Sequence, residues 1–77
     1  MDVEIKGEGI DIDLEQLTIS EYRKFAQGSM LDSEDDALLA KVTGKTVEWV
    51  QGLSQPAYRR LLAAFFRKAR EPLADPN

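Results

Sequence analysis

Near the end of the chain, apolar side chains recur at helical spacing over three turns: Tyr58, Leu61, Leu62, Phe65, Phe66 and Ala69. Residues three and four positions apart share one side of an α-helix, so this row predicts a helix with a continuous apolar face about 20 Å long. Ser54 is placed to cap this helix, Pro56 falls in its first turn, and Pro72 stops it. Because other parts of the chain must cover such a face, we expect a mainly α fold packed around it.

A helix is also expected after residue 18, because Thr18 and Glu21 have the spacing of a capping box. Gly28 is a suitable end for this helix. The side chains expected on its buried side follow at helical spacing: Ile19, Tyr22, Phe25 and Ala26. The segment before residue 28 is therefore predicted to be a short amphipathic helix.

Two more helices are marked by their ends. The acidic run 32–36 is suited to the cap and first turn of a helix, where negative charge complements the helix dipole. Gly44 would end this second helix, and Thr46 would cap a short third helix that carries Trp49 and extends to Leu53. The apolar stripe of the second helix is predicted to consist of three residues: Leu38, Leu39 and Val42.

The first fourteen residues alternate between charged and apolar side chains, the latter being Val3, Ile5, Ile10, Ile12 and Leu14. With Gly7-Glu8-Gly9 in the middle, this pattern predicts a β-hairpin with a turn of three or more residues, one face apolar and the other acidic. A lone hairpin is marginally stable, so it should lie against the helices. The predicted fold is thus mainly α, with three to four short helices and an N-terminal hairpin, or a small α+β fold. We expect one domain over residues 1–77, with the hairpin over 1–14, a helical region over 18–70 and a frayed tail over 71–77.

The 77 residues include no cysteine and no histidine, which excludes disulfides, most zinc sites and catalysis by histidine or thiol groups. Gly44-Lys45-Thr46 lacks the first glycine of a phosphate-binding loop, and the acidic run 32–36 lacks the spacing of a calcium loop. We therefore expect no metal, no cofactor and no enzymatic activity. A hydrolase that uses carboxylates alone is a weaker alternative, because no two acids fall in an evident apolar cleft.

The chain shows no export signal and no apolar run long enough to cross a membrane, so a cytoplasmic protein is expected. Its net charge of −4 is unevenly divided: residues 1–38 carry −8 and residues 39–77 carry +4. Most of the positive charge falls on the last predicted helix.

The exposed side of that helix is the predicted partner-binding surface, formed by Arg59, Arg60, Arg67 and Lys68 with Phe66 and Trp49 at its edge. These bases could face the acidic hairpin or the second helix of the same chain, an acidic partner, or the acidic half of a second copy. The last arrangement would give self-association, head to tail.

Residues 35–53 also have the outline of a helix-turn-helix, which makes a small DNA-binding regulator the alternative function. The second helix of that unit offers Val47, Glu48 and Trp49, with only Lys45 as a nearby base. A net negative charge further opposes binding to nucleic acid, so we expect a protein partner instead.

Three short motifs follow one another along the chain: Leu17-Thr18-Ile19-Ser20-Glu21-Tyr22-Arg23, then Ala37-Leu38-Leu39-Ala40-Lys41-Val42-Thr43-Gly44-Lys45-Thr46, then Leu53-Ser54-x-x-Ala57-Tyr58-Arg59-x-Leu61 before Phe65-Phe66. Over residues 14–66 this order resembles the small tail assembly chaperones of tailed bacteriophages, in particular the group related to Mu-like and P2-like tail proteins. One departure is Ala57, where that group commonly has an acid.

The resemblance implies a non-catalytic protein of the infected cell's cytoplasm. Such chaperones are thought to bind the long helical tape measure protein, keep it soluble and help recruit tail tube subunits. They tend to occur as a short form and a longer, frameshifted form. No catalytic residue is implied by the resemblance.

Overall fold

A computed structural model gives the structure of the protein and describes residues 1–71. The chain runs through β1 (Val3–Ile5), β2 (Glu8–Ile10), a 3₁₀ helix η1 (Leu14–Gln16), α1 (Ile19–Gln27), α2 (Asp32–Thr43), α3 (Val47–Gln51) and α4 (Gln55–Arg70). The mainly helical fold with an N-terminal antiparallel hairpin is as predicted. Beyond Glu71, the predicted fraying of the tail lies outside the described residues.

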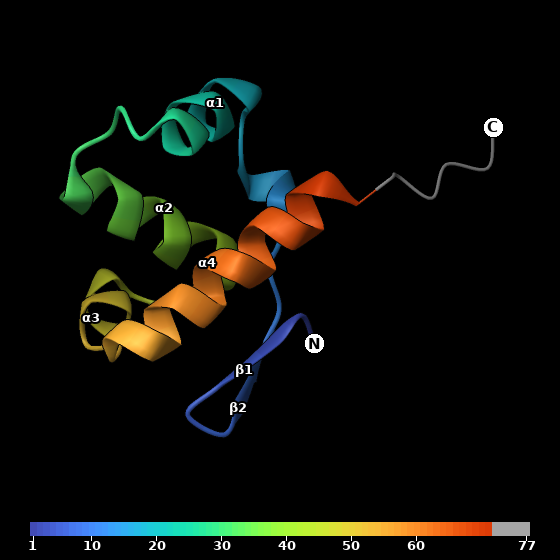
Figure 1. The fold of residues 1–77 in the computed structure, drawn as a ribbon, viewed down its shortest axis with the longest axis vertical. Helices are drawn as coiled ribbons and strands as arrows, with labels where there is room; N and C mark the ends of the chain where they lie inside the picture. The colour runs from blue at the N-terminus through green and yellow to red at the C-terminus, as the bar shows by residue number, and fades with distance from the viewer. Residues whose placement is uncertain (72–77) are drawn as a thin grey trace, which may run out of the picture.

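The long helix α4 organises the molecule, crossing it between the hairpin and the other helices (Figure 1). It packs against β1 on one side, while aromatic side chains join it to α1 on another. Leu61 and Phe65 are fully buried, as the apolar row predicted. The buried stripe is completed by Ala57 and Ala64, which were not part of that prediction. The remaining members of the row are only half-buried: Tyr58, Leu62, Phe66 and Ala69.

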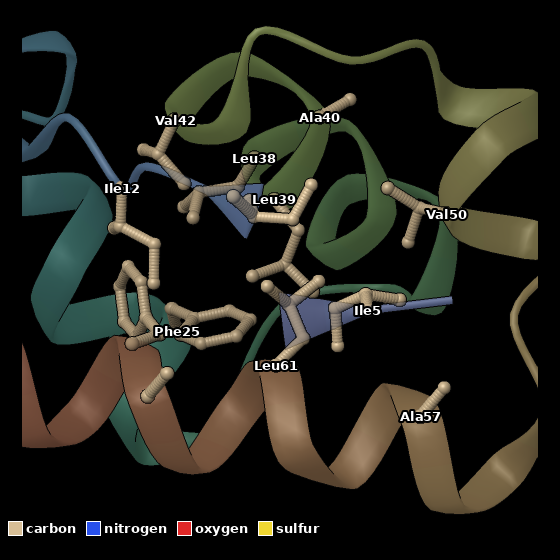
Figure 2. Packing of buried hydrophobic residues seen from close by; sticks show 13 residues of the cluster. Ile5, Ile12, Phe25, Leu38, Leu39, Ala40, Val42, Val50, Ala57 and Leu61 are labelled. Carbon is tan, nitrogen blue, oxygen red and sulfur yellow. The ribbon is translucent and has the colours of Figure 1, made fainter. Parts of the chain in front are cut away.

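Every helix from α1 to α4 and both strands contribute to one apolar core. Figure 2 shows Leu61 of α4 close to Ile5 of β1, with Leu39 of α2 above them. Ile12 lies toward Phe25 in the same view, so the segment after the hairpin also enters this core. The predicted stripe of α2 is buried throughout.

The turn of the hairpin differs from the prediction. Val3 pairs with Ile10 and Ile5 with Glu8, which leaves a two-residue turn at Lys6-Gly7 and places Glu8 and Gly9 in β2. Lys6 and Gly7 both have positive φ, 55° and 78°, as a turn that matches the right-handed twist of two strands requires. The alternation in sequence was correct, but the glycine that makes the turn is Gly7 alone.

The hairpin, predicted over residues 1–14, also ends early, at Ile10. Asp2 explains why, because its carboxylate accepts a hydrogen bond from the backbone N–H of Ile12 at 2.7 Å and so replaces a strand partner. Asp13 then donates its backbone N–H to the carbonyl of Val42 at 2.7 Å and caps η1 by accepting the N–H of Glu15. Ile12 is buried as expected, although it lies after the end of β2 and not in a strand.

The predicted helix ends are largely confirmed. Thr18 and Glu21 form the reciprocal capping box, and the hydroxyls of Thr46 and Ser54 each accept the N–H three residues onward. Gly28 and Gly44 end α1 and α2 with left-handed backbone.

Three predictions about the helices need correction. The residue that caps α2 is Leu31, whose N–H is accepted by Glu34, so the acidic run begins inside the helix. α3 stops at Gln51, short of Leu53. Ile19 is 62% exposed and Ala26 is exposed, because α1 reaches the core only through Tyr22 and Phe25.

Candidate protein-binding surface

The outer side of α4 carries four exposed arginines, Arg59, Arg60, Arg67 and Arg70, with exposed Ala63 among them. We call these five residues the basic face. Within residues 1–71 none of the four guanidinium groups forms an ion pair with a carboxylate. Arg67 donates one hydrogen bond, of 3.2 Å, to the backbone carbonyl oxygen of Asp2. The basic face therefore presents positive charge to any chain that approaches α4.

Lys68 does not belong to this face. It is nine residues from Arg59, which is two and a half helical turns, so the two side chains leave α4 on opposite sides. Its ammonium group lies 2.8 Å from the carboxylate of Asp2. This hydrogen bond raises the pKa of Lys68, while the N–H of Ile12 and then Lys68 lower the pKa of Asp2. The prediction that Lys68 lies on the exposed side with the arginines is thus wrong. Arg70, which was not in that prediction, is exposed and belongs to the basic face.

The two aromatic residues predicted at the edge of the surface lie in different places. Phe66 stacks on Phe25, with ring centroids 5.6 Å apart, and the guanidinium carbon of Arg70 lies 6.0 Å from its ring. It therefore borders the basic face. Trp49 belongs to α3, where the ammonium group of Lys45 lies 5.5 Å from its ring, and no arginine of α4 stacks on it within the described residues.

Lysines and arginines of the second half of the chain have different roles. Three ion pairs join an acid of residues 1–38 to a lysine of residues 39–77: Asp2–Lys68, Glu8–Lys45 and Glu21–Lys41. These are all the lysines in that half. Ion pairs between the two oppositely charged halves therefore form within one molecule, and all three of them use lysines. Sequence reasoning did not find this division, because it depends on which bases the fold brings to the hairpin and α1.

A second charged feature lies where the start of α4 meets α2 and α3. A shallow hollow of about 350 Å³ has an apolar floor of Val50 and Leu53, and polar groups from Asp36, Gln51, Gln55 and Tyr58. We call it the acidic hollow. The only hydrogen bond of the Asp36 carboxylate within residues 1–71 is a long one, 3.4 Å, to the amide of Gln51. Sequence reasoning assigned the acids at 32–36 only to the end of a helix and so missed this hollow.

The surroundings of the acidic hollow are strongly negative. Burial, and after it the charges of Asp36, Asp35 and Asp32, raise the pKa of the Tyr58 hydroxyl. Burial, and after it the neighbouring acids of the same turn, raise the pKa of Asp35. The Oδ1 atom of Asp35 is buried and accepts no hydrogen bond from residues 1–71. Both shifts have the sign expected where negative charge is poorly compensated.

Residues 1–71 contain no group of three or more carboxylates placed to hold a metal ion. A hollow of about 470 Å³ between α1 and α2 is lined by apolar Met30 and Leu38 and by the bonded pair Glu21–Lys41, among other residues. An ion pair of this kind positions two helices. The hydroxyl of Ser29, which also lines this hollow, donates a hydrogen bond to the backbone carbonyl oxygen of Lys24 at 3.2 Å.

The helix-turn-helix alternative meets a geometric difficulty. α3, which would be the recognition helix, is only five residues long. Val50 is buried and Trp49 half-buried, so its exposed side chains are those of Glu48 and Gln51. A helix that reads DNA must turn basic and polar groups outward, and α3 turns an acid and one amide outward.

None of the helices in residues 1–71 has the length and apolar character needed to span a bilayer. Comparison with protein-family models, with curated proteins and with solved structures finds no match to this chain.

Proposed function

We propose that this protein is a tail assembly chaperone of a tailed phage or prophage, acting in the host cytoplasm without catalysis. Its client would be the tape measure protein, with the tail tube protein as a second partner. The observation that carries the proposal is the basic face, because four arginines without an ion pair on one exposed helix side suit a long client with acidic residues. The family assignment itself comes from the motifs in the sequence.

The motifs behind the resemblance are compatible with a chaperone because most of their residues build the fold, and only Arg59 among them belongs to the basic face. Thr18, Glu21 and Ser54 cap helices, and Leu38 and Leu39 are buried. The departure at Ala57 also has a physical reason in this chain, since that residue is buried and an unpaired acid there would be costly.

Co-expression with the tape measure protein encoded by the same phage or prophage genome tests the proposal. We expect the client to move into the soluble fraction and to elute with the chain during size-exclusion chromatography. Arg60→Glu/Arg67→Glu should weaken the complex at least about tenfold, because two attractions become repulsions. Arg59→Glu/Arg60→Glu should act alike, and it spares the bond from Arg67 to Asp2.

The matched control is Arg23→Glu/Lys24→Glu on α1, which makes the same change in net charge at an exposed site far along the chain. It should leave the complex intact, and circular dichroism should show that all three variants are folded. An insoluble client with no co-elution would overturn the proposal. Salt-sensitive binding of the wild-type chain to duplex DNA, lost in the Arg59→Glu/Arg60→Glu variant, would favour the DNA-binding alternative instead.

A further inference from the structure

The basic face and the acidic hollow are complementary charged surfaces that do not meet within one molecule. No arginine of α4 bonds to Asp32, Asp35 or Asp36 within residues 1–71, although these acids lie near Tyr58 at the start of the same helix. The arginines leave α4 on its outer side, whereas Tyr58 and Gln55 line the hollow beside α2 and α3. Each surface therefore keeps its charge available for a neighbouring chain.

The acidic hollow has the chemistry that accepts a guanidinium group. Its lining includes Asp36, Tyr58 and two glutamines, Gln51 and Gln55, beside apolar Val50 and Leu53. Carboxylates and aromatic faces are the two partners that arginine prefers at interfaces, since its planar cation gives up hydration easily. The buried, unpartnered oxygen of Asp35 adds negative potential that a cation would relieve.

We propose that the chain associates with itself, with the basic face of α4 in one copy docking on the acidic hollow of a second copy. The contact joins two different surfaces, so each copy keeps one surface of either kind, and the assembly can extend as a ring or an open chain. Self-association uses the same arginines as the proposed client contact, so a client and a second copy compete for them. The contact between copies nevertheless exists without any client, and its test does not involve one.

Sedimentation equilibrium of the purified full chain, compared at about 0.02 M and about 0.5 M salt, tests this contact. We expect concentration-dependent association at low salt that weakens at high salt. Arg59→Glu/Arg60→Glu reverses the charge of the basic face. Asp32→Lys/Asp36→Lys reverses the charge of Asp36, which lines the hollow, and of Asp32, whose charge acts on the same Tyr58 hydroxyl. Each should raise the dissociation constant at least about tenfold, because like charges then meet.

Mixing the two variants makes the test specific. In an equimolar mixture the contacts between unlike variants are attractive again, so we expect association that neither variant shows alone. Arg23→Glu/Lys24→Glu, with the same net charge as the arginine variant, should associate like the wild type. Asp36→Asn removes charge at the hollow with little change of shape and should weaken association in the same direction, even if the lysine variant is poorly folded.

Three outcomes would overturn the proposal: a wild-type chain that stays monomeric at low salt, variants that associate like the wild type, or a mixture that stays monomeric. A chain that associates as described but does not hold the tape measure protein in solution would contradict the proposed function alone. The two proposals therefore fail separately.

Discussion

The carboxylate of Asp2 and the ammonium group of Lys68 lie 2.8 Å apart, although 66 positions separate them in the chain. The same carboxylate accepts the backbone N–H of Ile12 at 2.7 Å. Asp2 thus joins the start of the hairpin, the segment that leaves it and the last turns of α4. Its two roles can be separated by mutation.

Asp2→Ala should lower the free energy of unfolding by about 2 kcal/mol, since it removes a charged acceptor and leaves the N–H of Ile12 unsatisfied. Lys68→Met should cost less than about 1 kcal/mol, because the pair is partly exposed, 27% for Asp2 and 36% for Lys68, and water screens it. Urea unfolding of both variants and of the double variant measures the difference. Equal costs for the two single variants would show that the bond to Ile12 contributes nothing.

Glu21 should make the fold sensitive to acid. The hydrogen bond from Lys41, and after it the N–H of Thr18, lower the pKa of Glu21 from 4.5 to about 2. Between these values the unfolded chain binds a proton that the folded chain does not, so the free energy of unfolding falls as the pH drops from about 4.5 to about 2. Glu21→Gln should show a smaller fall over this range, and so should Lys41→Met, which removes the partner. Thermal unfolding at a series of pH values measures it, and a fall as steep as in the wild type would contradict this assignment.

The adjacent Phe65 and Phe66 should differ in their contribution to stability. Phe65 is fully buried and meets Phe25 edge to face with ring centroids 5.1 Å apart, whereas Phe66 is half-buried. Phe65→Leu should therefore cost about 1–2 kcal/mol and Phe66→Leu less than about 1 kcal/mol. Denaturant unfolding of the two variants gives the comparison. A larger cost at Phe66 would mean that α4 is rotated relative to this description.

The turn of the hairpin gives a pair of changes with opposite signs. Lys6 has a φ of 55°, a conformation that asparagine tolerates better than lysine, so Lys6→Asn should stabilise the fold by about 0.5 kcal/mol. Gly7 has a φ of 78° and free space around it, so Gly7→Ala should destabilise by about 1 kcal/mol through backbone strain alone. Melting temperatures measured side by side test both signs. If both variants melt as the wild type does, the turn does not lie at these residues.

The features that the sequence predicted correctly are those decided within a few residues. Thr18, Thr46 and Ser54 cap helices through bonds to the third residue onward, and the row with Leu61 and Phe65 is a pattern of one helix. Such signals need no knowledge of the rest of the fold. They were sufficient for the fold class and for most of the boundaries.

The features that the sequence did not predict depend on partners far along the chain. Ile19 has the spacing of a buried residue, and its exposure follows only from the way α1 meets α4. By sequence alone Lys68 is equivalent to its neighbour Arg67, and only the fold places Asp2 beside Lys68. The acidic hollow likewise exists because α2, α3 and the start of α4 converge. Spacing along one helix predicts an apolar side but does not show how much of that side another element covers.

The contact between β1 and α4 has a consequence during synthesis on the ribosome. Ile5 and Leu61 are both fully shielded from water, and they lie close together in the core (Figure 2). During translation, Ile5 of the hairpin cannot pack against Leu61 until α4 has left the exit tunnel. An apolar side chain made early in translation is thus buried only after a helix made more than fifty residues later has emerged.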